Sequence, residues 1–529
     1  MGTAPLFTDS RRLLGPSLWL DAPGVTLEVP LPHGHNSELL RGWAGRVTWM
    51  CAAVGWPDTA LTMRRHVAGT TLAFTAPPSA LMSATALNEW SLEAAAEEYL
   101  IRYDAADLEP ERLHLDQPRA LVRLREMIAE EAAVPPADAA PIPDRAIPIV
   151  LVTGSNGKTT TTRLIAAMLR TAGHTVGFSC TDGVFIGTDE VERGDWSGPG
   201  GARRVLEDPR VTAAVLESAR GGMLRRGIVA PHADVVVVTN VAADHFGDYG
   251  IHSLEDIAEL KTSLALVLRD QGTLVLNGDD PLLNPASAYV RLSAAAKALP
   301  AERRVTFSLA SPWPTTLPAV EEIPITANGA ARFNIANVLA ATTAARALGV
   351  SDAVIASTLK TFGADPRDNA GRLMRLAIGG VTVIVDYAHN PHGLGALLHA
   401  ARAMAPGRLL LLLGQAGDRD DDAIRALTRT AWEAQPALVV LKDLDGYLRG
   451  RAPGAIPALM ADELVRRGAH PDQLLTVLEE MAAAKTLLQH AQPGDLLVLP
   501  VHALEARNQV LALLEQLQGE GWSAGDPLP

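Results

Sequence analysis

From residue 147 onwards, short apolar runs alternate with amphipathic windows in which apolar residues recur at helical spacing. The apolar runs predict strands at 147–152, 211–216, 233–238, 273–276, 381–385, 409–413, 438–441 and 496–499. Neighbouring positions within each run are mostly apolar, which is typical of parallel strands that are buried on both faces. Because parallel strands need a crossover between them, the pattern predicts an α/β architecture.

A proline-rich stretch separates this region from the residues before it. Residues 132–148 contain Pro135, Pro136, Pro141, Pro143 and Pro148. Proline fixes φ and lacks an N–H donor, so this stretch is expected to be an extended linker. Residues 1–131 mix strand-like runs with a helical window near 91–101 and are predicted to form an α+β domain. A second boundary near 362–368 divides the remainder into domains at 149–364 and 365–529.

The composition narrows the classes of partner. Lys plus Arg number 46 and Asp plus Glu number 60, giving a net charge of −14. An acidic chain is poorly suited to neutralising nucleic acid or anionic lipid, so neither partner is expected. Only Cys51 and Cys180 are present, and the charged first twenty residues do not resemble a signal peptide. We therefore expect a cytoplasmic protein without a disulfide framework or a membrane span.

The sharpest motif lies between a predicted strand and a predicted helix. Residues 152–160 read VTGSNGKTT, which places Gly154, Ser155, Asn156, Gly157, Lys158, Thr159 and Thr160 in a phosphate loop. Glycines let backbone N–H groups turn towards phosphate oxygens, and the helix N-terminus adds partial positive charge. Lys158 would bridge the β- and γ-phosphates and the Thr159 hydroxyl would bind Mg²⁺. Only two residues separate Gly154 from Gly157, so a purely structural turn is the alternative.

This loop and four further motifs, in the same order, resemble the Mur ligase family, which includes folylpolyglutamate synthetase. The other motifs are LES at 216–218, NVAADH at 240–245, NGDDP at 277–281 and DYAHNP at 386–391. Residues 179–183, 217–225 and 414–420 are most similar to the Mur-ligase-like portion of cyanophycin synthetases. The ATP-grasp domain of those enzymes has no counterpart between the first domain and the phosphate loop.

The resemblance implies a P-loop Mur-ligase-like central domain, a Rossmann-like C-terminal α/β domain and a small N-terminal domain. It also implies an ATP- and Mg²⁺-dependent amide ligase, which activates a carboxylate as an acyl phosphate for attack by an amino-acid amine. A ligase of the folylpolyglutamate or peptidoglycan-precursor type keeps this chemistry with other substrates. A non-catalytic nucleotide-binding scaffold is the alternative from another class.

The resemblance implies that Lys158, Glu217, His245 and Lys261 carry the catalysis. Glu217 and Thr159 would hold Mg²⁺, His245 would serve a second Mg²⁺, and Lys158 would contact the phosphates. Lys261 matches a lysine that is often carbamylated near the second metal. A structural histidine at position 245 and an ordinary surface lysine at position 261 are the alternatives.

The nucleotide contacts implied by the family come from two regions. Asn334 and Asn337 stand near the expected adenine position on a predicted helix start, with Phe333 where the family has histidine. A helix N-cap at Asn334 is the alternative. Arg372 resembles an arginine that reaches ATP from the C-terminal domain, and Asp386 resembles an acid that binds the ribose.

The substrates are the least constrained part of the interpretation. The likeness implies a small-molecule or peptide carboxylate, of aspartyl type, and an amino-acid amine such as arginine. Arg220 and Arg225 could bind a carboxylate, and His389 and Asp418 are further candidates. Salt-bridged surface arginines and a solvated acidic face are the alternatives. The family also suggests a homo-oligomer.

Overall fold

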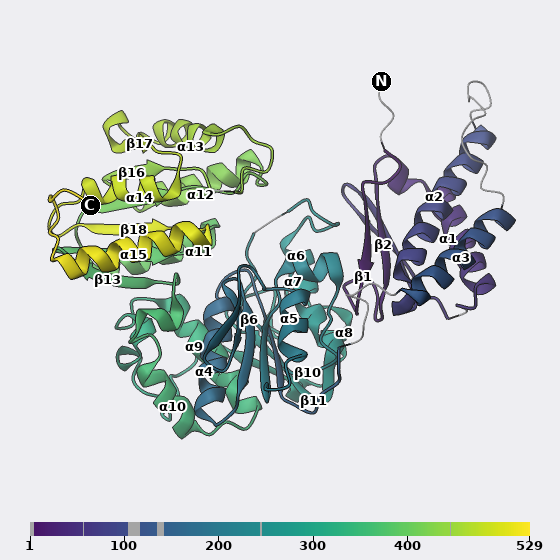
Figure 1. Ribbon diagram of the computed structural model, residues 1–529, viewed down its shortest axis with the longest axis horizontal. Helices are drawn as coiled ribbons and strands as arrows, with labels where there is room; N and C mark the ends of the chain where they lie inside the picture. Colours follow the sequence, from purple (N-terminus) through teal and green to yellow (C-terminus); the bar gives the residue numbers. More distant parts are fainter. Residues whose placement is uncertain (1–4, 57, 104–116, 135–141, 244–245, 445) are drawn as a thin grey trace. The chain divides into compact units, whose positions relative to one another are not determined.

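Figure 1 shows a computed structural model of the chain, which describes residues 5–529 except 57, 104–116, 135–141, 244–245 and 445. The chain divides into two compact units. Unit 1 contains residues 1–154, 173–241 and 245–306, and unit 2 contains residues 155–172, 242–244 and 307–529. The domain boundaries expected from the sequence stay predictions, and part of the proline-rich stretch, 135–141, lies outside the described residues.

The N-terminal part of unit 1 is an antiparallel sheet packed against helices, as the α+β prediction requires. Its elements are β1 (Asp9–Leu13), β2 (Gly24–Pro30), β3 (Leu61–His66), β4 (Gly69–Thr75), α1 (Ser37–Ala53), α2 (Leu81–Tyr103) and α3 (Gln117–Ala133). The strand order is β1-β2-β4-β3. One face of the sheet and the helices share a core that includes Leu27, Trp43, Leu72 and Phe74. The helical window near 91–101 lies inside α2.

The second sheet of unit 1 has the order β12-β11-β10-β5-β9-β6-β7-β8. Its strands are β5 (Ile149–Thr153), β6 (Val176–Cys180), β7 (Gly183–Ile186), β8 (Asp189–Arg193), β9 (Ala213–Glu217), β10 (Ala233–Val238), β11 (Leu268–Asn277) and β12 (Arg304–Phe307). The pairs β11–β10, β10–β5 and β5–β9 are parallel, as predicted, and β9 also pairs in parallel with β6, a strand that was not predicted. The β6–β7 and β7–β8 pairs are antiparallel. We did not predict this edge, because the DEVER sequence of β8 is polar and has no apolar run.

Helices of unit 1 cover one face of this sheet. They are α5 (Pro199–Leu206), α6 (Arg220–Arg226), α7 (Leu254–Thr262) and α8 (Ala294–Ala298). Leu216 and Val236 of the sheet share a core with Val205, Leu224 and Leu260 of the helices. The intervening positions of the central strands, such as Val150, Val215 and Val237, are also buried, which explains the continuous apolar runs of the sequence.

Unit 2 begins with helices that pack on one another. These are α4 (Lys158–Thr171), α9 (Arg332–Ala347) and α10 (Asp352–Thr361). The Thr358 hydroxyl of α10 donates to the Thr171 hydroxyl of α4 across 3.0 Å. The helix predicted after the phosphate loop is confirmed as α4, which begins directly after Gly157.

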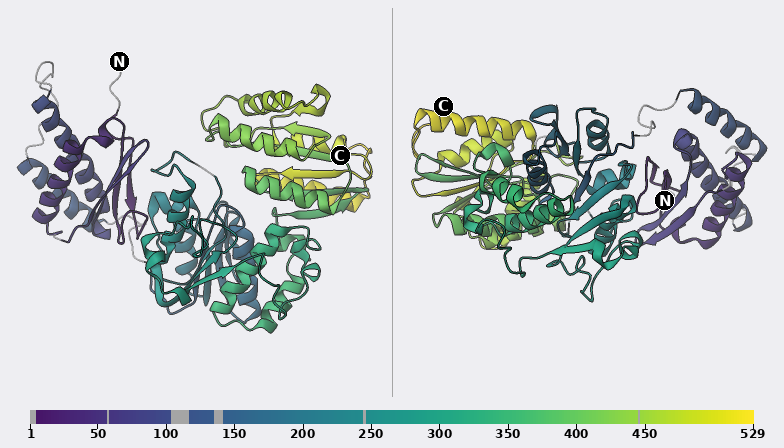
Figure 2. Two further views of the ribbon diagram at one scale, coloured as in Figure 1. Left: turned by 180° about the vertical axis from the view of Figure 1, so that it is seen from behind. Right: turned by 90° about the horizontal axis from the view of Figure 1, so that it is seen from below.

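The C-terminal sheet of unit 2 is covered by helices on both faces (Figures 1 and 2). Its elements are β13 (Met374–Ile378), β14 (Val381–Asp386), β15 (Leu409–Leu413), β16 (Leu438–Leu441), β17 (Leu474–Thr476), β18 (Leu496–Pro500), α11 (Pro391–Met404), α12 (Asp421–Glu433), α13 (Ala455–Arg466), α14 (Glu480–Gln489) and α15 (Leu504–Glu520). The order is β13-β14-β18-β15-β16-β17, and only the β13–β14 pair is antiparallel.

The leucine run of β15 shows why the strands of this sheet have continuous apolar sequences. Leu410 and Leu412 pack with residues of α14 and α15. Leu409, Leu411 and Leu413 pack on the other face with residues of α11, α12 and α13. Successive side chains of a strand point to opposite faces, so both faces must be apolar when both are covered. The strands predicted at 381–385, 409–413, 438–441 and 496–499 are confirmed.

Candidate functional site

The predicted phosphate loop joins β5 to the N-terminus of α4, as the motif requires. Gly154 has φ +152° and Gly157 has φ +83°. A Cβ on Gly154 would lie 1.8 Å from Thr239 Oγ1, and one on Gly157 would lie 2.2 Å from Asn337 Oδ1. Lys158 Nζ donates to the Ser155 carbonyl at 3.2 Å, and Ser155 Oγ accepts from Ala242 N at 2.9 Å. Close packing and backbone conformation therefore both favour glycine at these two positions.

Of the two asparagines expected near adenine, Asn337 packs against Gly157 of the loop and Asn334 accepts a hydrogen bond from Asn337. Asn337 Oδ1 accepts from the Thr161 hydroxyl at 3.4 Å, and Asn337 Nδ2 donates to Asn334 Oδ1 at 3.1 Å. Asn334 in turn donates to the Ile325 carbonyl. The N-cap of α9 is Ala331, so the alternative that Asn334 caps this helix is wrong. The adenine contact stays a prediction, and the observed contacts support the phosphate loop.

The start of α11 holds the loop at Asn156. Asn390 Nδ2 donates to Asn156 Oδ1 at 3.0 Å, and Asn156 Nδ2 lies 3.1 Å from His392 Nδ1. Asn390 Oδ1 also caps α11 by accepting from Gly393 N. Sequence reasoning left Asn390 without a role and missed His392, whose only signal is its position after the DYAHNP motif. One asparagine therefore links the cap of α11 to the phosphate loop.

Arg372 and Asp386, the predicted nucleotide residues of the C-terminal region, lie close to this loop within unit 2. Arg372 donates to Thr159 Oγ1 at 3.4 Å, and its guanidinium lies 4.5 Å from the centre of the Tyr387 ring. Asp386 ends β14 and accepts from the N–H groups of Leu373 and Ala388. Leu373, directly before β13, has φ +49°. This backbone conformation is uncommon for residues other than glycine and is found preferentially at functional sites. Burial raises the pKa of Asp386, although the Leu373 N–H and the Arg372 charge oppose that shift.

Asn369 is a further residue near the loop that sequence reasoning missed. Its Nδ2 donates to the Thr160 hydroxyl at 3.2 Å and to the Arg372 carbonyl at 3.1 Å. The Arg163 side chain of α4 donates to the neighbouring Ala370 carbonyl. The only sequence signal is that Asn369 lies three residues before Arg372. The segment 369–372 is thus tied to the first turns of α4.

Glu217 occupies the position predicted for a metal ligand, at the carboxyl end of β9 in unit 1. It pairs in register with Val152 of β5, so it lies beside the strand that enters the phosphate loop. Its side chain accepts from the Thr181 hydroxyl at 3.1 Å and from the Thr181 N–H at 3.4 Å, and only 1% of the residue is exposed. Thr181 was not singled out from the sequence as a site residue. A buried carboxylate at a strand end is a suitable hard oxygen ligand for Mg²⁺.

Lys261 is a buried residue of α7, with 3% of its surface exposed. The alternative of an ordinary surface lysine is therefore wrong. Burying a charged ammonium is costly unless it is paired or chemically modified. His245 lies outside the described residues, and its metal role stays a prediction.

The residues proposed for substrates differ in their surroundings. Arg220 is the first residue of α6 and lies 3.6 Å from an oxygen of Asp248, while Arg225 is exposed and donates to the Gly221 carbonyl. His389 Nδ1 lies 3.1 Å from the Tyr387 carbonyl. Asp418 is exposed and pairs with Arg419. Its neighbour Asp420 caps α12 by accepting from Ala423 N, so part of the acidic run has a structural role.

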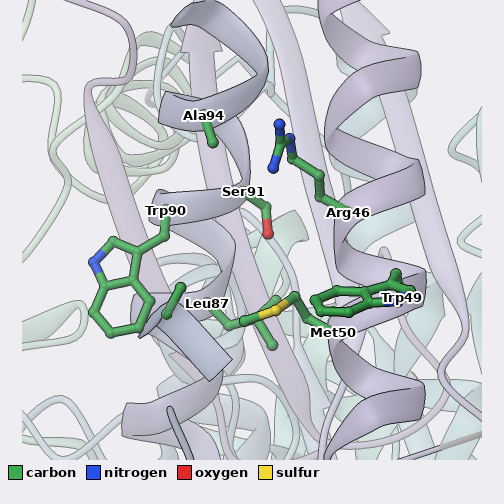
Figure 3. Close-up of a pocket in the computed structure, with 8 residues that line it drawn as sticks. Arg46, Trp49, Met50, Leu87, Trp90, Ser91 and Ala94 are labelled. Carbon is green, nitrogen blue, oxygen red and sulfur yellow. The ribbon is translucent and has the colours of Figure 1, made fainter. Parts of the chain in front are cut away.

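A shallow groove lies elsewhere, between α1, α2 and α3 of unit 1 (Figure 3). It is lined by Arg46, Trp49, Met50, Leu87, Trp90, Ser91, Ala94 and Ala120. None of the predicted site residues lines it, so it does not belong to the candidate nucleotide site.

Within the part of the chain that the structure describes, no three or more His, Cys, Asp or Glu residues gather in a way that could hold a metal. None of the described helices combines the length and the apolar character needed to cross a membrane.

Comparisons with known proteins agree with this geometry. Residues 152–345 match the Mur ligase middle domain, and residues 371–500 match the Mur ligase, glutamate ligase domain. Cyanophycin synthetase of Trichormus variabilis is 37% identical over 67% of this chain and 41% of its own length. The chain thus spans only 41% of this relative. The UDP-N-acetylmuramoyl-L-alanyl-D-glutamate–2,6-diaminopimelate ligase of Gloeobacter violaceus is 30% identical over 60% of this chain and 68% of its own length.

A solved structure shares the fold. The bifunctional folylpolyglutamate synthase/dihydrofolate synthase of Yersinia pestis, complexed with AMPPNP and a Mn ion, is 19% identical and has a TM-score of 0.51. The comparison covers 80% of this chain and 98% of that protein.

The fold and the two matched domains are those of the Mur ligases. The chain belongs to the Mur ligase family. The α/β fold expected from the sequence is confirmed.

Proposed function

We propose that the chain joins a carboxylate to an amino-acid amine with ATP and Mg²⁺, in the manner of the ligase portion of cyanophycin synthetase. The observation that carries the proposal is the supported phosphate loop. Gly157 abuts Asn337, Asn156 is held by Asn390, and Arg372 reaches Thr159. A loop fixed in this way presents its N–H groups to phosphate without reorganising them during the reaction.

The proposed reaction has two steps. A carboxylate oxygen attacks the γ-phosphorus of ATP, which forms an acyl phosphate and releases ADP. An amine then attacks the acyl carbon, inorganic phosphate leaves, and the nitrogen loses a proton as the amide forms. Lys158 and Arg372 would neutralise negative charge on the phosphates, and the loop amides would position them.

The residues present fit a magnesium ion by the chemistry of their donors. Thr159 in the first turn of α4 supplies a hydroxyl, and Glu217 supplies a buried carboxylate. Mg²⁺ commonly takes one or two protein oxygens together with phosphate oxygens and water. When bound, it would supply positive charge to the triphosphate. His245 is proposed for a second ion from the family resemblance alone.

Lys261 is proposed as a carbamylated lysine, and its burial supports this assignment. A carbamate would replace the ammonium by an anionic oxygen donor. We expect Lys261→Met to lose ligation and short carboxylates added at high concentration to restore part of it. Failure of such rescue, with no bicarbonate dependence in the wild type, would contradict the carbamate.

The proposed substrates are an aspartyl-type carboxylate and arginine, with Arg220 and Arg225 on the donor side and His389 and Asp418 on the acceptor side. Their support is the 37% identity to cyanophycin synthetase. The second candidate is a ligase of the peptidoglycan-precursor type, because the diaminopimelate ligase match covers 68% of that enzyme. A homo-oligomer is part of the proposal and rests on the family alone.

The experiment measures ADP release and product mass with panels of acids and amines for both candidates. Lys158→Ala should abolish ADP release while leaving the circular dichroism spectrum unchanged. Lys297→Ala, at an exposed lysine of α8, is the matched control and should behave as wild type. Nucleotide binding without turnover on any acid and amine pair would favour the non-catalytic scaffold and contradict the ligase.

A further inference from the structure

Three ionisable side chains of the C-terminal sheet form a buried cluster that the proposed reaction does not use. Lys442 follows β16, Glu480 begins α14 and His502 follows β18. Lys442 and Glu480 are each 0% exposed and form an ion pair, and His502 is 7% exposed. Glu480 also accepts from the backbone N–H groups of His502 and Ala503, at 3.1 and 2.9 Å.

The partners of His502 determine where its ring proton resides. Lys442 Nζ lies 3.5 Å from His502 Nδ1, and an ammonium can only donate. Glu480 Oε1 lies farther from Nδ1, at 3.8 Å, so Nδ1 accepts from Lys442 and the proton of the neutral ring is on Nε2. Nε2 lies 3.0 Å from the Ala388 carbonyl, which can only accept. Burial and the Lys442 charge lower the pKa of His502 to about 4 despite Glu480, so the ring is neutral near pH 7.

The end of this chain of contacts is the loop that carries the candidate nucleotide residues. The N–H of Ala388 donates to Asp386 Oδ1 at 2.7 Å. The Tyr387 ring makes edge contacts with the rings of His502 and His389, at 5.3 and 5.4 Å, and Arg372 lies over it. Both groups of the loop that face His502, the Ala388 carbonyl and the Tyr387 ring, are thus directly connected to Asp386 or Arg372.

A buried ion pair is a poor way to gain stability, because desolvation can exceed the attraction between the charges. An apolar cluster of similar volume would serve a core at least as well. The three ionisable groups lie at the carboxyl ends of two parallel strands, where α/β sheets place their ligand-binding loops.

The geometry points to Lys442, Glu480 and His502 as positioning residues that fix the Tyr387–Ala388 peptide, and through it Asp386 and Arg372, for nucleotide binding. The inference rests on the proposed function, since it assumes that Asp386 and Arg372 contact ATP. Glu480 orients Lys442, Lys442 sets the tautomer of His502, and His502 holds the Ala388 carbonyl.

The test uses three variants of the full chain. His502→Phe keeps a ring beside Tyr387 but removes both polar contacts. His502→Gln can still donate to the Ala388 carbonyl. His490→Phe, at an exposed histidine of the same sheet region, is the matched control. Circular dichroism and thermal melting identify the folded protein, and Mg²⁺–ATP binding is measured by calorimetry alongside KM and kcat.

We expect His502→Phe to raise the Kd and KM for ATP about tenfold, which corresponds to about 1.4 kcal/mol, with kcat changed less than threefold. His502→Gln should recover most of this loss, and His490→Phe should match the wild type. The defect should be the same at pH 6 and pH 9, because the ring is neutral throughout. Histidine ring ¹⁵N spectra of the wild type should show a neutral Nε2–H tautomer for His502.

The outcomes separate this inference from the proposed function. If the wild-type chain binds no ATP, both the proposed function and the positioning role of Lys442, Glu480 and His502 are wrong. If the wild type binds ATP and a folded His502→Phe variant binds it equally well, only the positioning role of the three residues is wrong. An Nδ1–H tautomer, or an equal loss in His502→Phe and His502→Gln, also overturns it.

Discussion

Two buried clusters of this chain contain the same three kinds of group, a cation, a carboxylate and an imidazole, but in different surroundings. In unit 1, Arg11 pairs with Glu28, whose other oxygen lies 3.5 Å from His66 Nε2. In unit 2, Lys442 pairs with Glu480 beside His502. The chemistry of a buried cluster therefore does not by itself reveal what the cluster does.

The unit 1 cluster joins the N-terminal sheet to the second sheet's helices. Arg11 donates to the Leu224 carbonyl of α6 at 2.9 Å and lies over Tyr249. His66 stacks on His252, and Arg64 pairs with Asp256 and Glu259 of α7. No candidate nucleotide residue of unit 2 takes part. We interpret this cluster as a structural connection, in contrast to the cluster around His502.

The largest expected effect tests whether the Arg11–Glu28–His66 cluster of unit 1 has only a structural role. Arg11→Met leaves the Glu28 carboxylate buried without its cation, which should lower the free energy of unfolding by about 3–5 kcal/mol. ATP affinity of the folded variant should remain within twofold of wild type. Denaturant unfolding followed by tryptophan fluorescence measures the loss, since Trp19 lies 4.9 Å from Arg11.

The matched control is Arg123→Met, because Arg123 forms an exposed pair with Glu126. Its stability should change by less than about 1 kcal/mol. A tenfold loss of ATP affinity in a folded Arg11→Met variant would contradict the separation of roles.

The second prediction concerns the phosphate loop. Gly157→Ala forces a left-handed backbone on alanine and drives its Cβ into Asn337, so ATP binding should weaken at least about tenfold. Gly173→Ala, at φ +98° with open space around it, carries the backbone strain without the clash. It should lose stability by about 1 kcal/mol but keep its ATP affinity. Equal ATP affinities for the two variants would show that the packing of Gly157 against Asn337 does not contribute to ATP binding.

A smaller effect is expected at Asn390, which caps α11 and holds Asn156. Asn390→Ala should lose about 1 kcal/mol of stability and raise the KM for ATP a few fold, because a cap and a loop contact disappear together. Ser351→Ala removes the cap of α10, where Ser351 accepts from Val354 N, and no loop contact. The two variants should match in thermal melting and differ in KM; a similar KM would mean that Asn390 acts only as a cap.

The smallest effect is a pH dependence that distinguishes the two clusters. Burial lowers the pKa of His502 to about 4, helped by Lys442 and opposed by Glu480. Its contribution to stability is full above the unfolded histidine pKa of about 6.5 and is lost as pH falls through the folded value. Between pH 7.5 and 5.5 this should remove about 1 kcal/mol.

His252 provides the comparison. Burial and His66 lower its pKa, while Asp256 and Glu28 oppose the shift, so its contribution is lost in the same direction. Because His252 is less buried, His252→Gln should flatten the pH dependence of the urea midpoint less than His502→Gln does. The reverse order would contradict the assignment of His502 as the more deeply buried neutral ring.

The sequence predicted the parallel core well because its signal is local. A strand such as 409–413 must be apolar on both faces when helices cover both, and the run is visible without a structure. The edge strands β8 and β13 lack that signal, since polar residues are tolerated where one side is open. The phosphate loop was also predictable, because glycine, lysine and threonine must lie between a strand and a helix.

The supports of the site could not be predicted in this way. Lys442, Glu480 and His502 are separated by 38 and 22 residues in the chain and meet only because β16 and β18 end at the same edge of one sheet. The burial of Lys261 and the hydrogen bond between Asn390 and Asn156 likewise depend on tertiary packing. Residue type and spacing identify groups that act on a ligand, but they do not show which groups hold those in place.

The central claim is that ATP activates a carboxylate as an acyl phosphate. The most direct measurement supplies a donor acid labelled with ¹⁸O in its carboxylate, together with the amine, and analyses the inorganic phosphate by mass spectrometry. The account predicts one ¹⁸O atom transferred to each phosphate, with no transfer in Lys158→Ala. Amide product formed with unlabelled phosphate would contradict it.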